Sequence, residues 1–323
     1  MKTLKKILKW TGIFLVLVIL FVVIWSMTMW DQKFEAPLPD IHATSDSAVI
    51  AHGKYLVYGP AHCADCHTNL ADFEKKERGE EVPLAGGFEF KLPFGSVFSR
   101  NLTNDETGIK NITDPEIARV LRYGVMPDGK VVLDFMAFHN TSDEDLTAII
   151  SYLRSMPPVK REIPADKWNF IGKLILSTMI TPVGPDGEVP KSVTPDTTAV
   201  YGKYLATSIA NCKGCHTNRD LKTGKFIGEP YAGGFKMDDP NYPNTYFVSR
   251  NLTPDPETGH IYSWSEAQFI NRFRQGKLIA GSPMPWGPFG NFSDNDLKAI
   301  YSYLKTLAPI KNDPGPSVQK IEE

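Results

Sequence analysis

The sequence predicts an all-α protein in which an N-terminal transmembrane helix precedes two tandem helical domains of the same fold. Three observations predict this architecture. The chain opens with a long uncharged apolar run, its remainder repeats at an offset of about 150 residues, and each repeat carries capped amphipathic helices between segments rich in Gly, Pro and Asn. Neither repeat shows an extended alternation of apolar and polar residues, so no strands are expected.

The first expected element is a membrane anchor within residues 1–30. Lysines at positions 2, 5, 6 and 9 precede a run without charge from Trp10 to Trp30. A helix of this length spans about 31 Å, which matches the hydrocarbon thickness of a bilayer. The lysines predict a cytoplasmic N-terminus. A cleaved secretory signal remains the alternative, although no Ala-x-Ala cleavage pattern follows the run. Both interpretations export everything from the linker at residues 31–47 onward.

The rest of the chain is a tandem duplication. Five motifs return in the same order: Gly-Lys-Tyr-Leu at 53 and 202, Cys-His-Thr-Asn at 66 and 215, Ala-Gly-Gly-Phe at 85 and 232, Ser-Arg-Asn-Leu-Thr at 99 and 249, and a Ser-Asp-x-Asp-Leu segment at 142 and 293. The repeats define a first domain at residues 48–158 and a second at 198–309. Between them, residues 159–197 form a Pro-rich linker with a short helix around Trp168–Ile175, and residues 310–323 form a mobile tail.

Helix signals occupy equivalent places in the two domains. One helix is expected to begin each domain, carrying Tyr55 or Tyr204 toward the cysteines. A second follows the capping-box residues Thr113 and Glu116, or Ser265 and Gln268, and ends at Gly124 or Gly276. A third is capped by Ser142 or Ser293.

Charge excludes one class of partner. Lys and Arg total 35 and Asp and Glu total 37, giving a formal net charge of −2. Because no basic excess exists to neutralise a phosphate backbone, nucleic acid is not an expected partner.

The chemistry resides in two Cys-x-x-Cys-His motifs, at Cys63, Cys66 and His67 and at Cys212, Cys215 and His216. This spacing fits covalent haem attachment: two thiols one helical turn apart bind both vinyl groups, and the next histidine meets the iron. Zinc is the structural alternative, but each domain offers Cys, Cys and His where a closed site needs four ligands. A disulfide in this spacing is strained and belongs to a thioredoxin-like setting that the sequence lacks.

Methionine is the expected sixth iron ligand, because both domains supply one between the second and third helices. In the second domain it is Met284. In the first domain Met136 is favoured over Met126, because an aromatic residue lies two positions after Met136, as it does after Met284. His139 is a further alternative in the first domain. A methionine ligand closes the iron site and favours the ferrous state, which predicts one-electron transfer. Arg100 and Arg250 are either haem-propionate partners or surface arginines, the second being preferred.

These motifs together resemble class I c-type cytochrome domains. They are similar in particular to the multihaem cytochrome subunits of membrane-bound bacterial alcohol and gluconate dehydrogenases. The resemblance implies two covalently bound haem c groups, held by the four motif cysteines, with axial ligands at the positions given above. Two departures are visible: those subunits usually carry three haem domains, and Ala137 stands where a proline often follows the ligand methionine.

The expected protein is therefore an electron carrier and not an enzyme: a single-pass, membrane-anchored dihaem c-type cytochrome with its haem domains on the periplasmic side of a bacterial inner membrane. It would carry single electrons in a respiratory chain, with a dehydrogenase or quinol-oxidising complex as donor and a terminal oxidase or soluble cytochrome as acceptor. The alternative is a dihaem c-type enzyme such as a cytochrome c peroxidase, which requires an open iron site and acid-base residues.

Overall fold

The computed structural model of the protein describes residues 2–220, 225–239, 242 and 244–320. The helices are α1 (Lys2–Met29), α2 (Ser47–Tyr58), α3 (Ala64–His67), α4 (Phe73–Glu77), α5 (Asp114–Tyr123), α6 (Asp143–Ser155), α7 (Phe170–Thr178), α8 (Ala199–Tyr204), α9 (Cys212–Cys215), α10 (Glu266–Arg274), α11 (Trp286–Phe289) and α12 (Asp294–Lys305), with a 3-10 turn at Leu70–Asp72 and a π-helical turn at Leu205–Ile209. The strands are β1 (Glu89–Leu92), β2 (Gly95–Phe98), β3 (Lys167–Trp168), β4 (Lys236–Asp238), β5 (Thr245–Val248) and β6 (Val318–Lys320).

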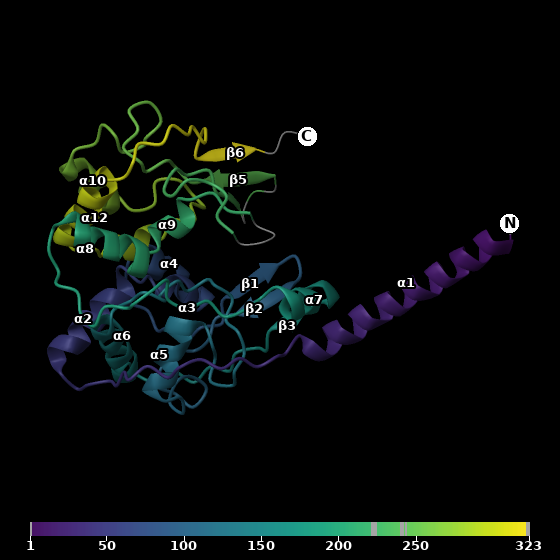
Figure 1. The fold of residues 1–323 in the computed structure, drawn as a ribbon. Helices are drawn as coiled ribbons and strands as arrows, with labels where there is room; N and C mark the ends of the chain where they lie inside the picture. Colours follow the sequence, from purple (N-terminus) through teal and green to yellow (C-terminus); the bar gives the residue numbers. More distant parts are fainter. Residues whose placement is uncertain (1, 221–224, 240–241, 243, 321–323) are drawn as a thin grey trace.

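The apolar N-terminal run forms the long helix α1, which projects from the rest of the molecule (Figure 1). In the part of the chain that the structure describes, it is the one helix long and apolar enough to cross a membrane. Nearly all of its side chains are exposed, and Ser26 is its one buried residue. The helix is therefore not a core helix of the globular part.

Each half of the duplication is organised by a close crossing of its first and last helices, α2 with α6 and α8 with α12. A Cβ atom built on Gly53 would lie 1.8 Å from the carbonyl oxygen of Ala148, and one built on Gly202 would lie 1.8 Å from that of Ala299. Only glycine permits this approach, which explains why the Gly-Lys-Tyr-Leu motif occurs in both halves. The apolar faces of these helices enter one continuous core.

The prediction of an all-α fold is wrong, because the structure contains two antiparallel three-stranded sheets, ordered β1-β2-β3 and β4-β5-β6. In each half a short hairpin receives its third strand from the segment that follows the last helix. Gly95 of β2 pairs with Trp168 of β3, and Thr245 of β5 pairs with Lys320 of β6. The segment expected to be a linker and the segment expected to be a mobile tail thus each supply a strand.

The sequence does not predict these strands because each is only two to four residues long, which is too short for a periodic pattern of apolar and polar residues. One local signal was available: Pro93 and Gly95 stand between the apolar residues of β1 and β2, as at a hairpin turn.

The predicted caps are present. The hydroxyl of Thr113 accepts from the Glu116 N–H while the Glu116 carboxylate accepts from the Thr113 N–H, and Ser265 and Gln268 repeat this capping box. At the end of α5, Gly124 adopts the left-handed conformation with φ 62°, as a C-terminal glycine does.

The two halves are joined by a reciprocal contact. The Tyr55 hydroxyl accepts from the Ser293 N–H, 2.9 Å away, and donates to the Asp296 carboxylate of the other half. The Tyr204 hydroxyl accepts from the Ser142 N–H at 3.0 Å and donates to Asp145. Each tyrosine thereby contacts the first turn of the last helix of the opposite half, and burial raises the pKa of both phenols.

The reciprocal contact is asymmetric at one position, where His52 of the first half corresponds to Tyr201 of the second. The His52 ring nitrogen Nε2 lies 2.7 Å from the Asp145 carboxylate. The hydrogen bond to Asp145 raises the pKa of His52, and the charges of Glu144 and Asp296 act in the same direction.

We predict that Gly202→Ala lowers the free energy of unfolding by about 1–3 kcal/mol, because the added methyl group must push α8 away from α12. Gly187→Ala is the matched control, since a Cβ there meets no atom within 4 Å. Urea denaturation followed by far-UV circular dichroism measures both variants. Equal midpoints for Gly202→Ala and the unsubstituted protein would contradict the close crossing.

We predict that His52→Gln destabilises the protein more at pH 5.5 than at pH 9. A histidine whose pKa is raised by folding contributes stability below its unfolded value of 6.5, and this contribution disappears as the pH rises through the folded value. Thermal unfolding midpoints at the two pH values measure the difference. His42→Gln is the control, because His42 pairs with Asp40 where both side chains are mostly exposed. A pH-independent effect of His52→Gln would argue against the charged pair.

Candidate functional site

The two cysteine motifs adopt the same conformation. The His67 N–H donates to the Cys63 carbonyl at 2.9 Å, and the His216 N–H donates to the Cys212 carbonyl at 2.9 Å. Each motif therefore forms one helical turn, which brings its two cysteines onto neighbouring positions. None of the four cysteines, all of which the structure describes, forms a disulfide.

The residue before each cysteine motif has a left-handed backbone conformation. His62 has φ 40° and Asn211 has φ 49°, values that side-chain-bearing residues rarely adopt. The two residues occupy equivalent positions in the duplication, so the chain enters both motifs through the same bend.

The motif thiols have raised pKa values. Burial raises the pKa of Cys63, Cys66 and Cys212 to about 12 and also raises the pKa of Cys215. A closed zinc site needs four ligands, and in the described part of the chain no three His, Cys, Asp or Glu side chains come together as metal ligands. The donor set of each motif, two thiols and a histidine, therefore fits haem attachment better than a zinc site.

Both motif histidines are oriented by a backbone carbonyl. Nδ1 of His67 lies 2.8 Å from the Arg100 carbonyl oxygen, and Nδ1 of His216 lies 2.9 Å from that of Arg250. A carbonyl oxygen can only accept, so Nδ1 carries the proton and the lone pair remains on Nε2. Burial lowers the pKa of both rings, which keeps them neutral. A neutral imidazole with a fixed tautomer is the form that binds a metal through Nε2.

The Ser-Arg-Asn-Leu-Thr segment holds these carbonyls in place, a role that sequence reasoning missed. The Ser99 hydroxyl accepts from the Phe88 N–H at 3.0 Å. The Asn101 side chain donates to the Val159 carbonyl at 2.8 Å and accepts from the Thr103 N–H at 2.9 Å. Ser249, Asn251 and Thr253 make the same bonds in the second half. The identity of the segment in both halves was the available signal.

The arginine side chains of this segment have protein partners. Arg100 pairs with Asp166 at 2.7 Å, and Arg250 donates to the Gly315 carbonyl. Each guanidinium thus fastens the strand-bearing segment after the last helix, and the carbonyl of the same residue orients the histidine.

Each Ala-Gly-Gly-Phe loop is hydrogen-bonded to the histidine of its cysteine motif. The Gly86 N–H donates to the His67 carbonyl at 2.7 Å, and the Gly233 N–H donates to the His216 carbonyl at 2.8 Å. Both glycines have positive φ, 69° and 75°, which glycine adopts without strain.

Met136 and Met284 share a local turn. The Phe138 N–H donates to the Met136 carbonyl at 3.0 Å, and the Trp286 N–H donates to the Met284 carbonyl at 2.8 Å. Both methionines are half-buried and pack against the same core that Cys63 and Cys212 contact. Met126 instead lies in a tight turn, where its N–H donates to the Lys130 carbonyl at 2.8 Å.

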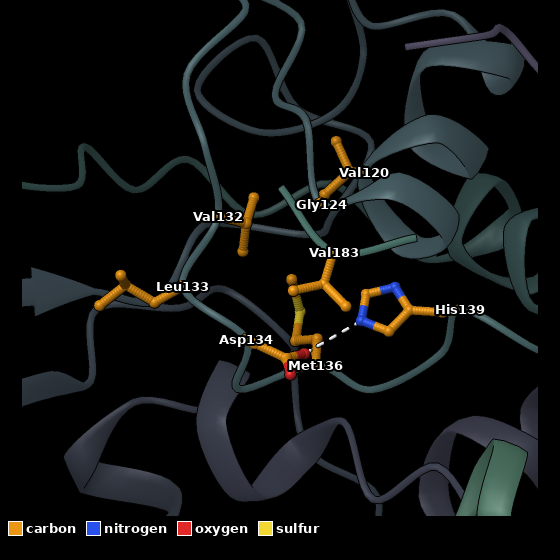
Figure 2. Close-up of a pocket in the computed structure, with 8 residues that line it drawn as sticks. All are labelled: Val120, Gly124, Val132, Leu133, Asp134, Met136, His139 and Val183. Carbon is orange, nitrogen blue, oxygen red and sulfur yellow. Dashed lines mark hydrogen bonds and ion pairs between the residues drawn. The ribbon is translucent and has the colours of Figure 1, made fainter. Parts of the chain in front are cut away.

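His139 uses both ring nitrogens within the protein. Nδ1 lies 3.0 Å from the Arg122 carbonyl, and Nε2 lies 3.0 Å from the Asp134 carboxylate. Burial acts to lower its pKa, but these hydrogen bonds outweigh burial and the pKa is raised. Figure 2 shows Met136 and His139 entering one small pocket, which Val120, Gly124, Val132, Leu133, Asp134 and Val183 also line. Because both nitrogens donate, His139 presents no lone pair in that pocket.

A segment of the second half packs beside the first cysteine motif. The segment after Met284 forms α11, whose Phe289 ring meets the His62 ring edge to face with centroids 5.2 Å apart. A Cβ on Gly287 would lie 2.3 Å from the Lys76 carbonyl of α4, and buried Lys76 pairs with Asp65 inside the first motif at 3.0 Å. The segment after Met284 thus contacts His62, which precedes the first cysteine motif, and Lys76, which pairs with a residue of that motif.

Comparison with known proteins agrees with this geometry. Residues 199–308 match the family model for cytochrome c. The chain is 29% identical over 289 residues to the cytochrome c subunit of a quinone-dependent alcohol dehydrogenase from Gluconacetobacter polyoxogenes, covering 84% of this chain and 58% of that one. It is 28% identical over 304 residues to the cytochrome subunit of a fructose dehydrogenase from Gluconobacter japonicus, covering 88% and 58%. It is 26% identical over 281 residues to the cytochrome c subunit of a gluconate 2-dehydrogenase from Pantoea cypripedii, covering 81% and 60%.

The predicted resemblance to cytochrome c subunits of dehydrogenases is confirmed by these matches. The relatives described above are cytochrome subunits of dehydrogenases, which supports the expected electron-transfer role and covalently bound haem c as the cofactor. The chain spans between 58% and 60% of the length of these three relatives.

Proposed function

We propose that this protein is a membrane-anchored dihaem cytochrome that transfers single electrons on the periplasmic side of a bacterial inner membrane, as the cytochrome subunit of a membrane-bound dehydrogenase. The observation that carries the proposal is the repeated donor set. Each half has two thiols on one helical turn, a neutral histidine whose Nδ1 is bound to an arginine carbonyl, and a methionine in the same short turn.

The proposed ligands divide between the halves. Cys63 and Cys66 would attach the first haem and Cys212 and Cys215 the second, with His67 and His216 as axial ligands. Met136 and Met284 would close the opposite sides, excluding small ligands. When bound, haem c supplies a one-electron iron couple, and a thioether ligand favours its ferrous form. Sites with both axial positions filled suit electron transfer and leave no open position for peroxide chemistry.

Contact between the halves supports transfer within the molecule. The Phe289 ring lies against His62, the neighbour of Cys63, and the Asn291 side chain donates to the Tyr58 and Gly79 carbonyls at 3.1 and 2.8 Å. These contacts fix the two halves against each other, so the proposed transfer between the two sites requires no domain movement.

The relatives support a dehydrogenase as the electron donor, because those described above are cytochrome subunits of alcohol, fructose and gluconate dehydrogenases. A terminal oxidase or a soluble cytochrome is the proposed acceptor. Helix α1, which has no charged residue from Trp10 to its end at Met29 and whose side chains are nearly all exposed, supports the membrane anchor.

Intact mass measurement tests the haem count. We predict the added mass of two haems in the purified chain. The double variant Cys63→Ala with Cys66→Ala should lose one haem, and Cys212→Ala with Cys215→Ala should lose the other, because each motif attaches its own group. The two double variants are each other's control. A chain of unmodified mass, or a double variant that keeps both haems, would refute the dihaem proposal.

Carbon monoxide binding tests the methionine ligands. We predict that Met136→Ala and Met284→Ala each open one ferrous iron to carbon monoxide, because the thioether that closes the site is gone. Met126→Ala is the matched control in the first half and should leave the visible spectrum unchanged. The Met136 assignment fails if Met126→Ala, and not Met136→Ala, binds carbon monoxide.

A further inference from the structure

Helix α7 packs along the end of the apolar helix α1, as Figure 1 shows. The Gln32 side chain donates to the Leu176 carbonyl at 3.2 Å. The Lys173 ammonium lies 5.0 Å from the centre of the Trp30 ring, a cation–π contact. Ser26 is buried although its neighbours on α1 are exposed. The contact therefore involves the final turns of α1 as well as the residues that follow it.

These turns lie inside the uncharged stretch from Trp10 to Trp30. Ser26 is four residues before Trp30 and half-buried Val22 is eight residues before it, so the two lie about 6 and 12 Å along the helix axis from Trp30. If α1 spans a bilayer over this stretch, α7 lies at the depth of the headgroups and the first part of the acyl chains.

The side of α7 that faces away from the protein is apolar. Ile171, Leu174 and Ile175 follow the i, i+3, i+4 spacing of one helix face; Ile171 is 58% exposed, and the other two are half-buried. Phe170 and Met179, at the two ends of the helix, are 44% and 55% exposed. The inner face is formed by buried Gly172, Leu176 and Ser177. The outward face is therefore apolar from Phe170 to Ile175, and Thr178 is the exposed polar residue at its C-terminal end. An apolar helix face of this kind is unusual in contact with water.

Helix α7 is fixed to the first half of the protein. A Cβ on Gly172 would lie 2.3 Å from the Phe94 carbonyl in the β1–β2 turn. The preceding residue pair forms β3, and the Trp168 ring stacks on the Phe94 ring with centroids 6.2 Å apart. The helix therefore has a set orientation relative to the first cysteine motif and is not a loose connection.

We propose that α7 is a second membrane contact, lying in the interfacial layer of a phospholipid bilayer with Ile171, Leu174 and Ile175 among the acyl chains. Interfacial helices bury an apolar face about 5–10 Å into this layer, which agrees with the position of α7 along α1. Lys173 and Trp30 lie where a cation and an indole ring meet lipid headgroups. The inference rests on the proposed anchoring by α1, and its effect is to hold the first half against the membrane surface.

Site-specific photocrosslinking tests the contact in the full-length cytochrome. p-Benzoylphenylalanine replaces Ile171, and the protein is reconstituted in vesicles of phosphatidylethanolamine and phosphatidylglycerol, irradiated and analysed by mass spectrometry. We expect a phospholipid adduct at position 171. The same substitution at Leu20 in α1 is the positive control, and at Val200, which is 81% exposed on α8, it is the negative control.

The outcomes separate the two proposals. A lipid adduct at position 20 with none at position 171, or with a protein adduct there, would overturn the role of α7 and leave the anchor intact. No lipid adduct at position 20 would overturn the anchor and the role of α7 with it. Substitution at Met179, at the other end of the helix, repeats the measurement if the variant at 171 fails to fold, and should also give a lipid adduct.

Discussion

The hydrogen bond from a motif histidine to an arginine carbonyl is the constraint around which each half is arranged. Its acceptor must be held within 3 Å of a buried ring, and no single residue achieves this. The loop glycines bind the histidine carbonyl, the Asn101 side chain fixes the chain just after Arg100, and the arginine side chain ties down the segment beyond the last helix. An acceptor held this firmly sets the histidine tautomer before any metal is present. The orientation of the motif histidine therefore depends on contacts that hold both its own backbone and the arginine carbonyl that it binds.

The duplication preserves this arrangement while its surroundings differ. Asp134 of the first half and Ser282 of the second half occupy equivalent positions. Asp134 pairs with His139, whereas the Ser282 hydroxyl accepts a hydrogen bond from the Trp286 indole. Arg272 stacks 3.5 Å from the centre of the Trp286 ring, at the position that Val120 occupies in the first half. Charges near an iron site alter its reduction potential. The contacts that orient the ligands are therefore shared, whereas the charges that surround the two proposed sites are not.

Sequence alone predicted the features that local chemistry determines. These features depend on residues that are close together in the sequence: the capping boxes at Thr113 and Ser265, the helical turn of each cysteine motif and the order of the repeated motifs. The sequence did not predict strands β3 and β6, because each pairs with a strand more than 70 residues earlier and is only two or three residues long. The sequence favours Met136 over Met126 by the aromatic residue two positions later, whereas the turn that Met136 shares with Met284 is a backbone hydrogen bond, which leaves no sequence motif.

Rigid attachment of the halves is what the proposed electron transfer needs. An electron passes between fixed sites without an open substrate pocket, so movement of one half relative to the other would only separate them. The reciprocal tyrosine contacts pair each phenol with a backbone N–H and a carboxylate of the opposite half, and losing one would leave a buried polar group without its partner. The Phe289 ring seated on His62 belongs to the same interface. The bonds that join the two halves therefore also hold the segment after Met284 beside His62, the residue before the first cysteine motif.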